Sequence, residues 1–115
     1  MNYRVVITID AENDLHRHIE YILEKFKNEQ AAKKNIIDDF EETKNNLAKS
    51  AGSLQYCENP RLNIQGYKRI NYLHHDYFML FRVVEDMAIV DNIFHFKDVA
   101  LPLPFADRRD IFISL

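Results

Sequence analysis

Residues 67–96 read YKRINYLHHDYFMLFRVVEDMAIVDNIFHF, and the pattern of this segment indicates the fold class. Three runs that are rich in β-branched and aromatic residues alternate in it with two short polar segments. The runs cover residues 67–73, 77–84 and 87–96, and the polar segments are 74–76 and 85–86. Such runs favour strands, and short polar segments between them are typical of tight turns. The stretch therefore predicts three consecutive antiparallel strands.

The chain before this stretch predicts one strand and two helices. Residues 3–9 are β-branched and aromatic and form an opening strand, after which Asp10 can cap a helix. Apolar residues then recur with helical spacing over residues 11–27 and, after a break near Asn28, over residues 29–48. The expected order is β-α-α-β-β-β, an α+β fold with the helical hairpin packed on one face of an antiparallel sheet.

Length and composition are those of one small domain, residues 1–115, with a C-terminal tail at 98–115. Hydrophobic residues make up 47% and charged residues 29% of the chain, which allows a buried core and a soluble surface. No apolar run approaches the ~20 residues that span a bilayer, so no membrane contact is expected. Cys57 is the single cysteine, which favours a reducing cytoplasm. It lies in a polar connection, residues 49–66, that we expect at the surface.

Alternation along the last two strands assigns each side chain to one face of the sheet. If Glu85 and Asp86 form a two-residue turn, Val84 pairs with Met87, and the later pairs follow from that register. One face is nearly all apolar and should lie under the helices; it carries Tyr77, Met79, Phe81, Val83, Ala88, Val90, Asn92, Phe94 and Phe96. The other face carries Phe78, Leu80, Arg82, Val84, Met87, Ile89, Asp91, Ile93 and His95.

The second face mixes charged groups with large apolar side chains. On the neighbouring strand Arg69 and Asn71 join it, while Lys68 points to the other face. A face of this kind is not normally left to water, so the C-terminal tail, another protein chain, or both should cover it. Arg82 lies diagonally across from Asp91 there, which predicts a cross-strand ion pair.

Few residues suggest catalytic chemistry. Histidine side chains titrate near neutrality, so His95 could serve as a proton shuttle or hold a structural hydrogen bond at a strand end. Cys57 could be a nucleophile or an incidental residue of the connection. His16 and His18 are two apart on a helix and cannot share a face, so no metal site is expected. There is no phosphate-binding glycine loop, so no cofactor is expected, and the net charge of −3 argues against a dedicated nucleic-acid binder.

Three segments carry a family resemblance: residues 67–70 (YKRI), 77–86 (YFMLFRVVED) and 93–98 (IFHFKD). They resemble the C-terminal half of RelE/ParE toxins of type II toxin–antitoxin systems. There a basic strand precedes a Tyr-rich apolar strand that ends in an Arg-Val-like pair and an acidic turn, and a last strand ends in an Ile-Leu-His-like triplet. The resemblance covers roughly residues 3–98, with the same element order.

This resemblance implies a toxin that a cognate antitoxin neutralises. RelE-like members cut messenger RNA on the ribosome, whereas ParE-like members inhibit DNA gyrase without being nucleases. In a nuclease Arg69 and His95 would be the catalytic residues. Asn71, Phe78 and Asp98, however, stand where RNA-cutting relatives place basic residues.

The depleted basic array favours a ParE-like toxin that acts by binding a protein, with DNA gyrase as the expected target. The alternatives are a RelE-like, ribosome-dependent mRNA endoribonuclease with a depleted active site, and an inactive toxin homologue. The expected partners are a cognate antitoxin and either DNA gyrase or the ribosome with its messenger RNA, and a homodimer is left open. The expected contact residues are Arg69, Asn71, Phe78, Arg82 and Lys97.

Overall fold

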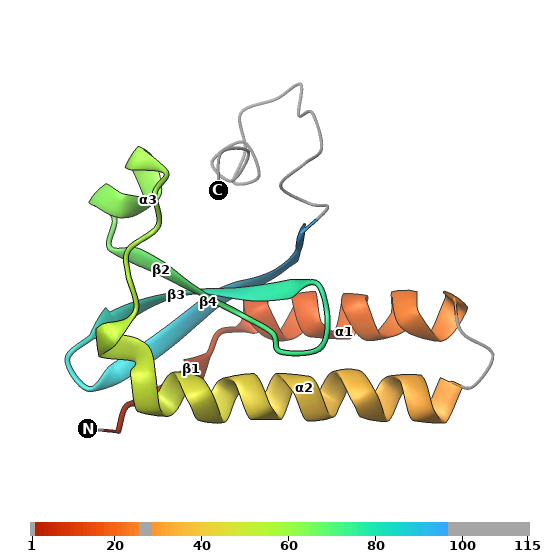
Figure 1. Ribbon diagram of the computed structural model, residues 1–115. Coiled ribbons are helices and arrows are strands. Elements are labelled where there is room, and N and C mark those ends of the chain that lie inside the picture. Colours follow the sequence, from red (N-terminus) through yellow and green to blue (C-terminus); the bar gives the residue numbers. More distant parts are fainter. Residues whose placement is uncertain (1, 26–28, 97–115) are drawn as a thin grey trace.

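The computed structural model of the chain describes residues 2–25 and 29–96 (Figure 1). Its elements are β1 (Arg4–Ile7), α1 (Ile9–Lys25), α2 (Glu29–Ser50), a 3-10 turn η1 (Ala51–Ser53), α3 (Pro60–Ile64), β2 (Tyr67–Asn71), β3 (Tyr77–Val84) and β4 (Met87–His95). The predicted α+β fold class is confirmed. The connection at 49–66 differs from the prediction because it contains η1 and α3. The break near Asn28 and the tail at 98–115 lie outside the described residues.

The four strands form one sheet in the order β1-β4-β3-β2. β2 pairs with β3, and β3 with β4, in antiparallel fashion as predicted, but β1 pairs with β4 in parallel. Chain direction explains the parallel pair. The two long helices run in opposite directions, so the chain returns to the end of the sheet at which β1 began (Figure 1). β2 therefore starts at that end, and β4, two reversals later, runs in the same direction as β1.

A β-bulge interrupts the pairing of β3 with β4. From the turn to Phe81, which pairs with Val90, the register is the predicted one. Beyond this point the register shifts by one residue, so that Leu80 pairs with Asn92, and Asp91 is the additional residue of β4. Because side chains alternate along a strand, one extra residue exchanges the faces of all that follow.

The predicted faces of the β4 residues beyond the bulge are therefore wrong, whereas those of the β3 residues 77–80 are confirmed. Ile93 pairs with Met79 and packs in the core under the helices. Phe94 pairs with Phe78 on the opposite face, where the two rings lie 5.8 Å apart. The face predictions for residues closer to the turn are confirmed.

Helix α1 begins at Ile9, two residues earlier than predicted, and Thr8 rather than Asp10 caps it. The Thr8 hydroxyl accepts a hydrogen bond from the Ala11 amide at 3.2 Å, as N-cap side chains do. The same hydroxyl donates to the Asp91 carbonyl, so the cap also ties the start of the helix to the bulge. Ile9, expected in the strand, is 77% exposed on the first helical turn.

Beyond the end of β1, helix α1 provides the hydrogen-bond acceptor at the edge of β4. β1 ends at Ile7, opposite Val90, so the edge N–H groups farther along β4 have no strand partner there. The carboxylate of Asp14, which is only 1% exposed, accepts hydrogen bonds from the Ile93 amide at 3.0 Å and from Asn92 Nδ2 at 3.2 Å. A buried donor without a partner costs free energy, so Asp14 stabilises this edge.

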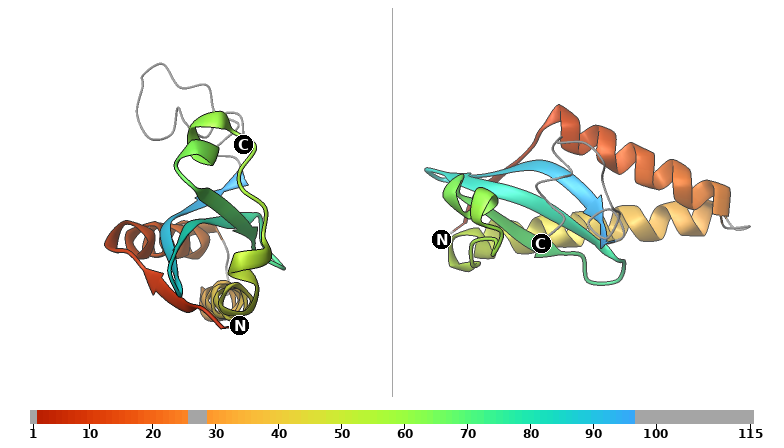
Figure 2. Two further views of the ribbon diagram at one scale, coloured as in Figure 1. Left: turned by 90° about the vertical axis from the view of Figure 1, so that its left-hand side faces the viewer. Right: turned by 90° about the horizontal axis from the view of Figure 1, so that it is seen from above.

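The main core lies between the sheet and the two long helices, which pack side by side (Figure 2). The predicted helical stripes supply it, including Ile19 and Ile22 of α1 and Ile36, Phe40 and Leu47 of α2. Within the described residues no helix is long and apolar enough to cross a membrane.

Replacing Asp14 with alanine should lower the free energy of unfolding by about 2–3 kcal/mol, because the buried Ile93 amide loses its charged acceptor. Urea unfolding followed by circular dichroism measures this. Asp14→Asn is the matched control, since an amide oxygen can still accept one bond, and its loss should be clearly smaller. An Asp14→Ala chain as stable as the wild type would contradict this role.

Candidate functional site

The candidate site is the outer face of the sheet, which is the face turned away from α1 and α2. Its side chains include Tyr67, Arg69, Asn71, Phe78, Leu80, Arg82, Asp91, Phe94 and Phe96. Among the predicted contact residues, Arg69, Asn71, Phe78 and Arg82 lie on this face. Lys97 is outside the described residues.

Part of the outer face is covered by the connection between α2 and β2. Leu62 of α3 and Cys57 pack with Phe78, Leu80 and Phe94 in a second apolar cluster. Figure 1 shows α3 across the sheet from α2. The sequence predicts that the tail or another chain covers this face, whereas in the structure the connection between α2 and β2 covers part of it.

Local sequence explains how the connection folds over the sheet. Asn59 caps α3, its Oδ1 accepting from the Arg61 amide at 3.0 Å, and Pro60 suits the first helical position. Tyr56 forms a bridge with Lys68, and the Cys57 amide donates to the Tyr67 carbonyl at 2.9 Å.

Arg69 lies against two aromatic rings of this face. Its guanidinium carbon lies 4.0 Å from the centre of the Phe78 ring and 5.6 Å from that of Phe96. Nε and Nη2 both donate to Asn71 Oδ1, at 3.2 and 2.9 Å. Phe78 is fully buried beneath, whereas Phe96 remains 37% exposed. We call these four residues the arginine platform.

The second arginine of this face is already neutralised. Arg82 Nε lies 2.9 Å from Asp91 Oδ2, which confirms the predicted cross-strand ion pair. The Tyr67 hydroxyl donates to the same oxygen at 2.9 Å. The bond to Asp91 raises the pKa of Arg82, and burial, followed by the bond to Asp91, raises that of Tyr67.

Lys68 points to the other face, as predicted, and it has a structural role. The side chain is only 5% exposed, and Nζ donates to the carbonyls of Ala51 and Gly52, at 3.3 and 3.4 Å. It also lies 4.7 Å above the Tyr56 ring. A cation there satisfies carbonyls that follow the last turn of α2, so Lys68 adds no charge to the outer face.

His95 was expected on the same face as Arg69, but the bulge turns it to the helical side. It pairs with Tyr77, and the two rings meet edge-on with centroids 4.9 Å apart. Tyr77 in turn packs against His18 of α1 at 4.5 Å. The two residues proposed as a catalytic pair are therefore on opposite faces of the sheet, and the structure does not bring them together.

The turn between β2 and β3 is held by an aspartate that sequence inspection missed. Asp39 of α2 accepts hydrogen bonds from the Leu73 and His74 amides, at 3.1 and 3.0 Å, and its Oδ2 lies 2.7 Å from His75 Nδ1. His75 is thus held in place by Asp39. The signal was present, because Asp39 interrupts the buried stripe of α2 between Ile36 and Phe40.

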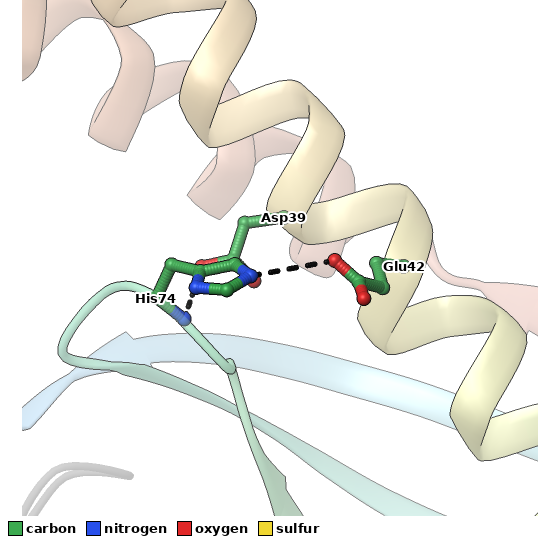
Figure 3. Close-up of side chains that lie close together, drawn as sticks. All are labelled: Asp39, Glu42 and His74. Carbon is green, nitrogen blue, oxygen red and sulfur yellow. Dashed lines mark hydrogen bonds and ion pairs between the residues drawn. The ribbon is translucent and has the colours of Figure 1, made fainter.

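Asp39, Glu42 and His74 are the described residues whose side chains could meet at one metal ion (Figure 3). Their potential ligand atoms lie within 4.8 Å of one another, and His74 Nε2 is 3.5 Å from Glu42 Oε2. Both Asp39 oxygens, however, already accept hydrogen bonds from the turn. A metal would have to compete with these bonds. The hydrogen bonds between Asp39 and the turn that joins β2 to β3 therefore account for the cluster.

The chain is similar to a known family and to solved structures. Residues 5–99 match the family described as ParE toxin of type II toxin–antitoxin system, parDE. A chain of the chromosomal ParDE system from P. aeruginosa is similar in fold, with a TM-score of 0.66 and 18% identity over 81% of this chain and 95% of that one. A chain of the RelBE2 toxin–antitoxin complex from Mycobacterium tuberculosis gives 0.54 and 15%, over 83% and 99%. Curated proteins gave no match.

Two tyrosines offer a test of the bond to Asp91. Tyr67→Phe should lower the free energy of unfolding by about 1 kcal/mol, because it removes a hydrogen bond to a charged group. Tyr72→Phe is the matched control, since the buried Tyr72 hydroxyl has no hydrogen-bond partner among the described residues. Its removal should leave stability unchanged or raise it. Urea unfolding of both variants checks this, and a larger loss for Tyr72→Phe would contradict it.

Cys57 should behave as a packing residue and not as a nucleophile. Burial raises the pKa of its thiol, so the reactive thiolate is scarce at neutral pH and increases only above the usual value of 9.0. We expect labelling by a thiol reagent at pH 7.5 to be slow in the folded chain and fast in urea. Equal rates in the two states would show that the thiol is accessible.

Proposed function

We propose a function for this chain on the basis of its family. The chain belongs to the ParE toxins of type II toxin–antitoxin systems. We propose that a cognate antitoxin protein holds it inactive, as the resemblance implies. When free, it arrests growth in the cytoplasm by binding a protein, for which DNA gyrase is the expected target.

The arginine platform is the observation that carries this proposal. Arginine and aromatic side chains are enriched at the centres of protein interfaces, where they supply contact area with little loss of conformational freedom. Arg69 is already oriented by Asn71, and Phe96 offers apolar surface beside it. Such a pre-ordered group suits contact with another protein.

The charges of the outer face support binding over RNA cleavage. Transesterification needs a base, an acid and groups that stabilise the charge of the phosphorane, all within reach of one phosphate. Among residues 2–25 and 29–96, Arg82 is neutralised by Asp91, Lys68 is buried against α2, and His95 lies on the opposite face from Arg69. The two alternatives are a RelE-like nuclease and an inactive toxin homologue, and each would give a different experimental result.

Expression of the full chain in a bacterium from a tightly regulated promoter tests the proposal. We expect survivor counts to fall while messenger RNA stays intact and plasmid supercoiling is lost. Arg69→Ala should restore at least about tenfold more survivors, since truncating a hot-spot residue costs about 2 kcal/mol or more of binding free energy. His95→Ala should remain toxic, and His16→Ala, at an exposed position on α1, is its matched control.

Other outcomes would contradict the proposal in distinct ways. Cleaved messages that His95→Ala protects would show a nuclease in spite of the separated faces. Intact messages, normal supercoiling and no arrest, from chain that circular dichroism shows to be folded, would identify an inactive homologue.

A further inference from the structure

The Arg69 guanidinium has one edge occupied and one edge open. An arginine fork can be approached along Nε and one terminal nitrogen, or along the two terminal nitrogens. Asn71 Oδ1 takes the first edge by accepting from both Nε and Nη2. No described residue accepts a hydrogen bond from Nη1 or forms an ion pair with Arg69. The open edge matches the spacing of two oxygens on one carboxylate or phosphate.

The position of Arg69 makes an external anion favourable. Phe78 closes one side of its guanidinium, and burial lowers the pKa of Arg69, which means that its charge is under-solvated. Arg17 and Arg82, in contrast, have described ion pairs with Asp14 and Asp91. A bidentate anion on the open edge would restore the solvation that Arg69 lacks.

The surroundings favour a carboxylate of a protein over a phosphate of nucleic acid. A nucleic acid is held by several cations that follow its backbone, and the chain has a net charge of −3. On the outer face Asp91 neutralises Arg82, so among the described residues of its strands Arg69 is the cation left to attract an anion there. Phe96 places partly exposed apolar surface beside that single charge, which suits an acidic side chain with an apolar neighbour.

We propose that the arginine platform is the docking site for one Asp or Glu carboxylate of the antitoxin, bound bidentately to the open Nη1–Nη2 edge of Arg69 with an apolar neighbour on Phe96. The inference rests on the proposed function, because it supposes an antitoxin. It adds the contact residue and the chemistry of the group that this residue recognises. Neutralisation by the antitoxin then blocks the same surface that the toxin offers to its target.

The probe is the purified product of the open reading frame adjoining the toxin gene, titrated calorimetrically into the full chain. Arg69→Lys keeps the charge but loses the planar fork, so we expect its dissociation constant to rise by about 30-fold or more. Arg17→Lys is the matched control, since it makes the same change at an arginine of α1 that already has Asp14 and lies away from the outer face. Its dissociation constant should change by less than about threefold.

A double-mutant cycle identifies the partner group. Each Asp and Glu of the probe is replaced in turn by its amide and titrated against the wild-type chain and Arg69→Lys. One amide should weaken binding to the wild type by a similar factor and have little further effect on Arg69→Lys. Additive effects at every acidic position would overturn the inference while leaving the antitoxin itself established.

Three other results would also overturn it. No binding of the probe to the wild-type chain would remove the proposed function together with the inference. Single-stranded RNA of 20 nucleotides that binds the wild type and not Arg69→Lys would assign the platform to nucleic acid. If amides in place of Asp98, Asp107 and Asp110 gave the same loss of stability as Arg69→Lys, without additivity, the chain's own carboxylates would be the occupants.

Discussion

Strand β4 holds one residue more than β3 can pair with, and the position of that residue determines both faces of the sheet. Asp91 is this additional residue, and the pairing register shifts by one position at it. The shift turns Ile93 into the core and Phe94 onto the outer face. The shift also leaves the Ile93 amide on the edge of β4, where Asp14 of α1 accepts its hydrogen bond. The packing of the first helix, the outer apolar cluster and the side of the sheet on which His95 lies all depend on this one bulge.

The charge of the outer face depends on which partners the basic side chains of β2 and β3 have. Lys68 stabilises the carbonyls after α2, and Arg82 is paired with Asp91, so both have internal roles. Arg69 instead lies over the Phe78 ring and near that of Phe96, and among the described residues an amide oxygen orients it. Within the described strands, this face thus presents one oriented cation without an ionic partner, which suits selective contact with a protein better than attraction of a polyanion.

Much of the fold could be predicted because the signals are local. Runs of apolar residues fixed the three C-terminal strands to within a few residues, and the turn at Glu85 fixed the register as far as Phe81. The Arg82–Asp91 pair was also foreseen, since both residues lie close to that turn. Propensity and alternation act over a few residues, so predictions from them hold until something interrupts the strand.

Local sequence signals were enough to predict the α+β class, the helical stripes and the membership of Arg69, Asn71 and Phe78 in one face. The bulge at Asp91 depends instead on long-range packing, because Thr8 and Asp14 bind the backbone and edge of β4 around the extra residue. Long-range packing likewise decided the partners of Lys68 and Asp39. Those contacts join positions about 17 to 35 residues apart, beyond the range of any local preference, and they form because a buried polar group must find a partner wherever the packing places one.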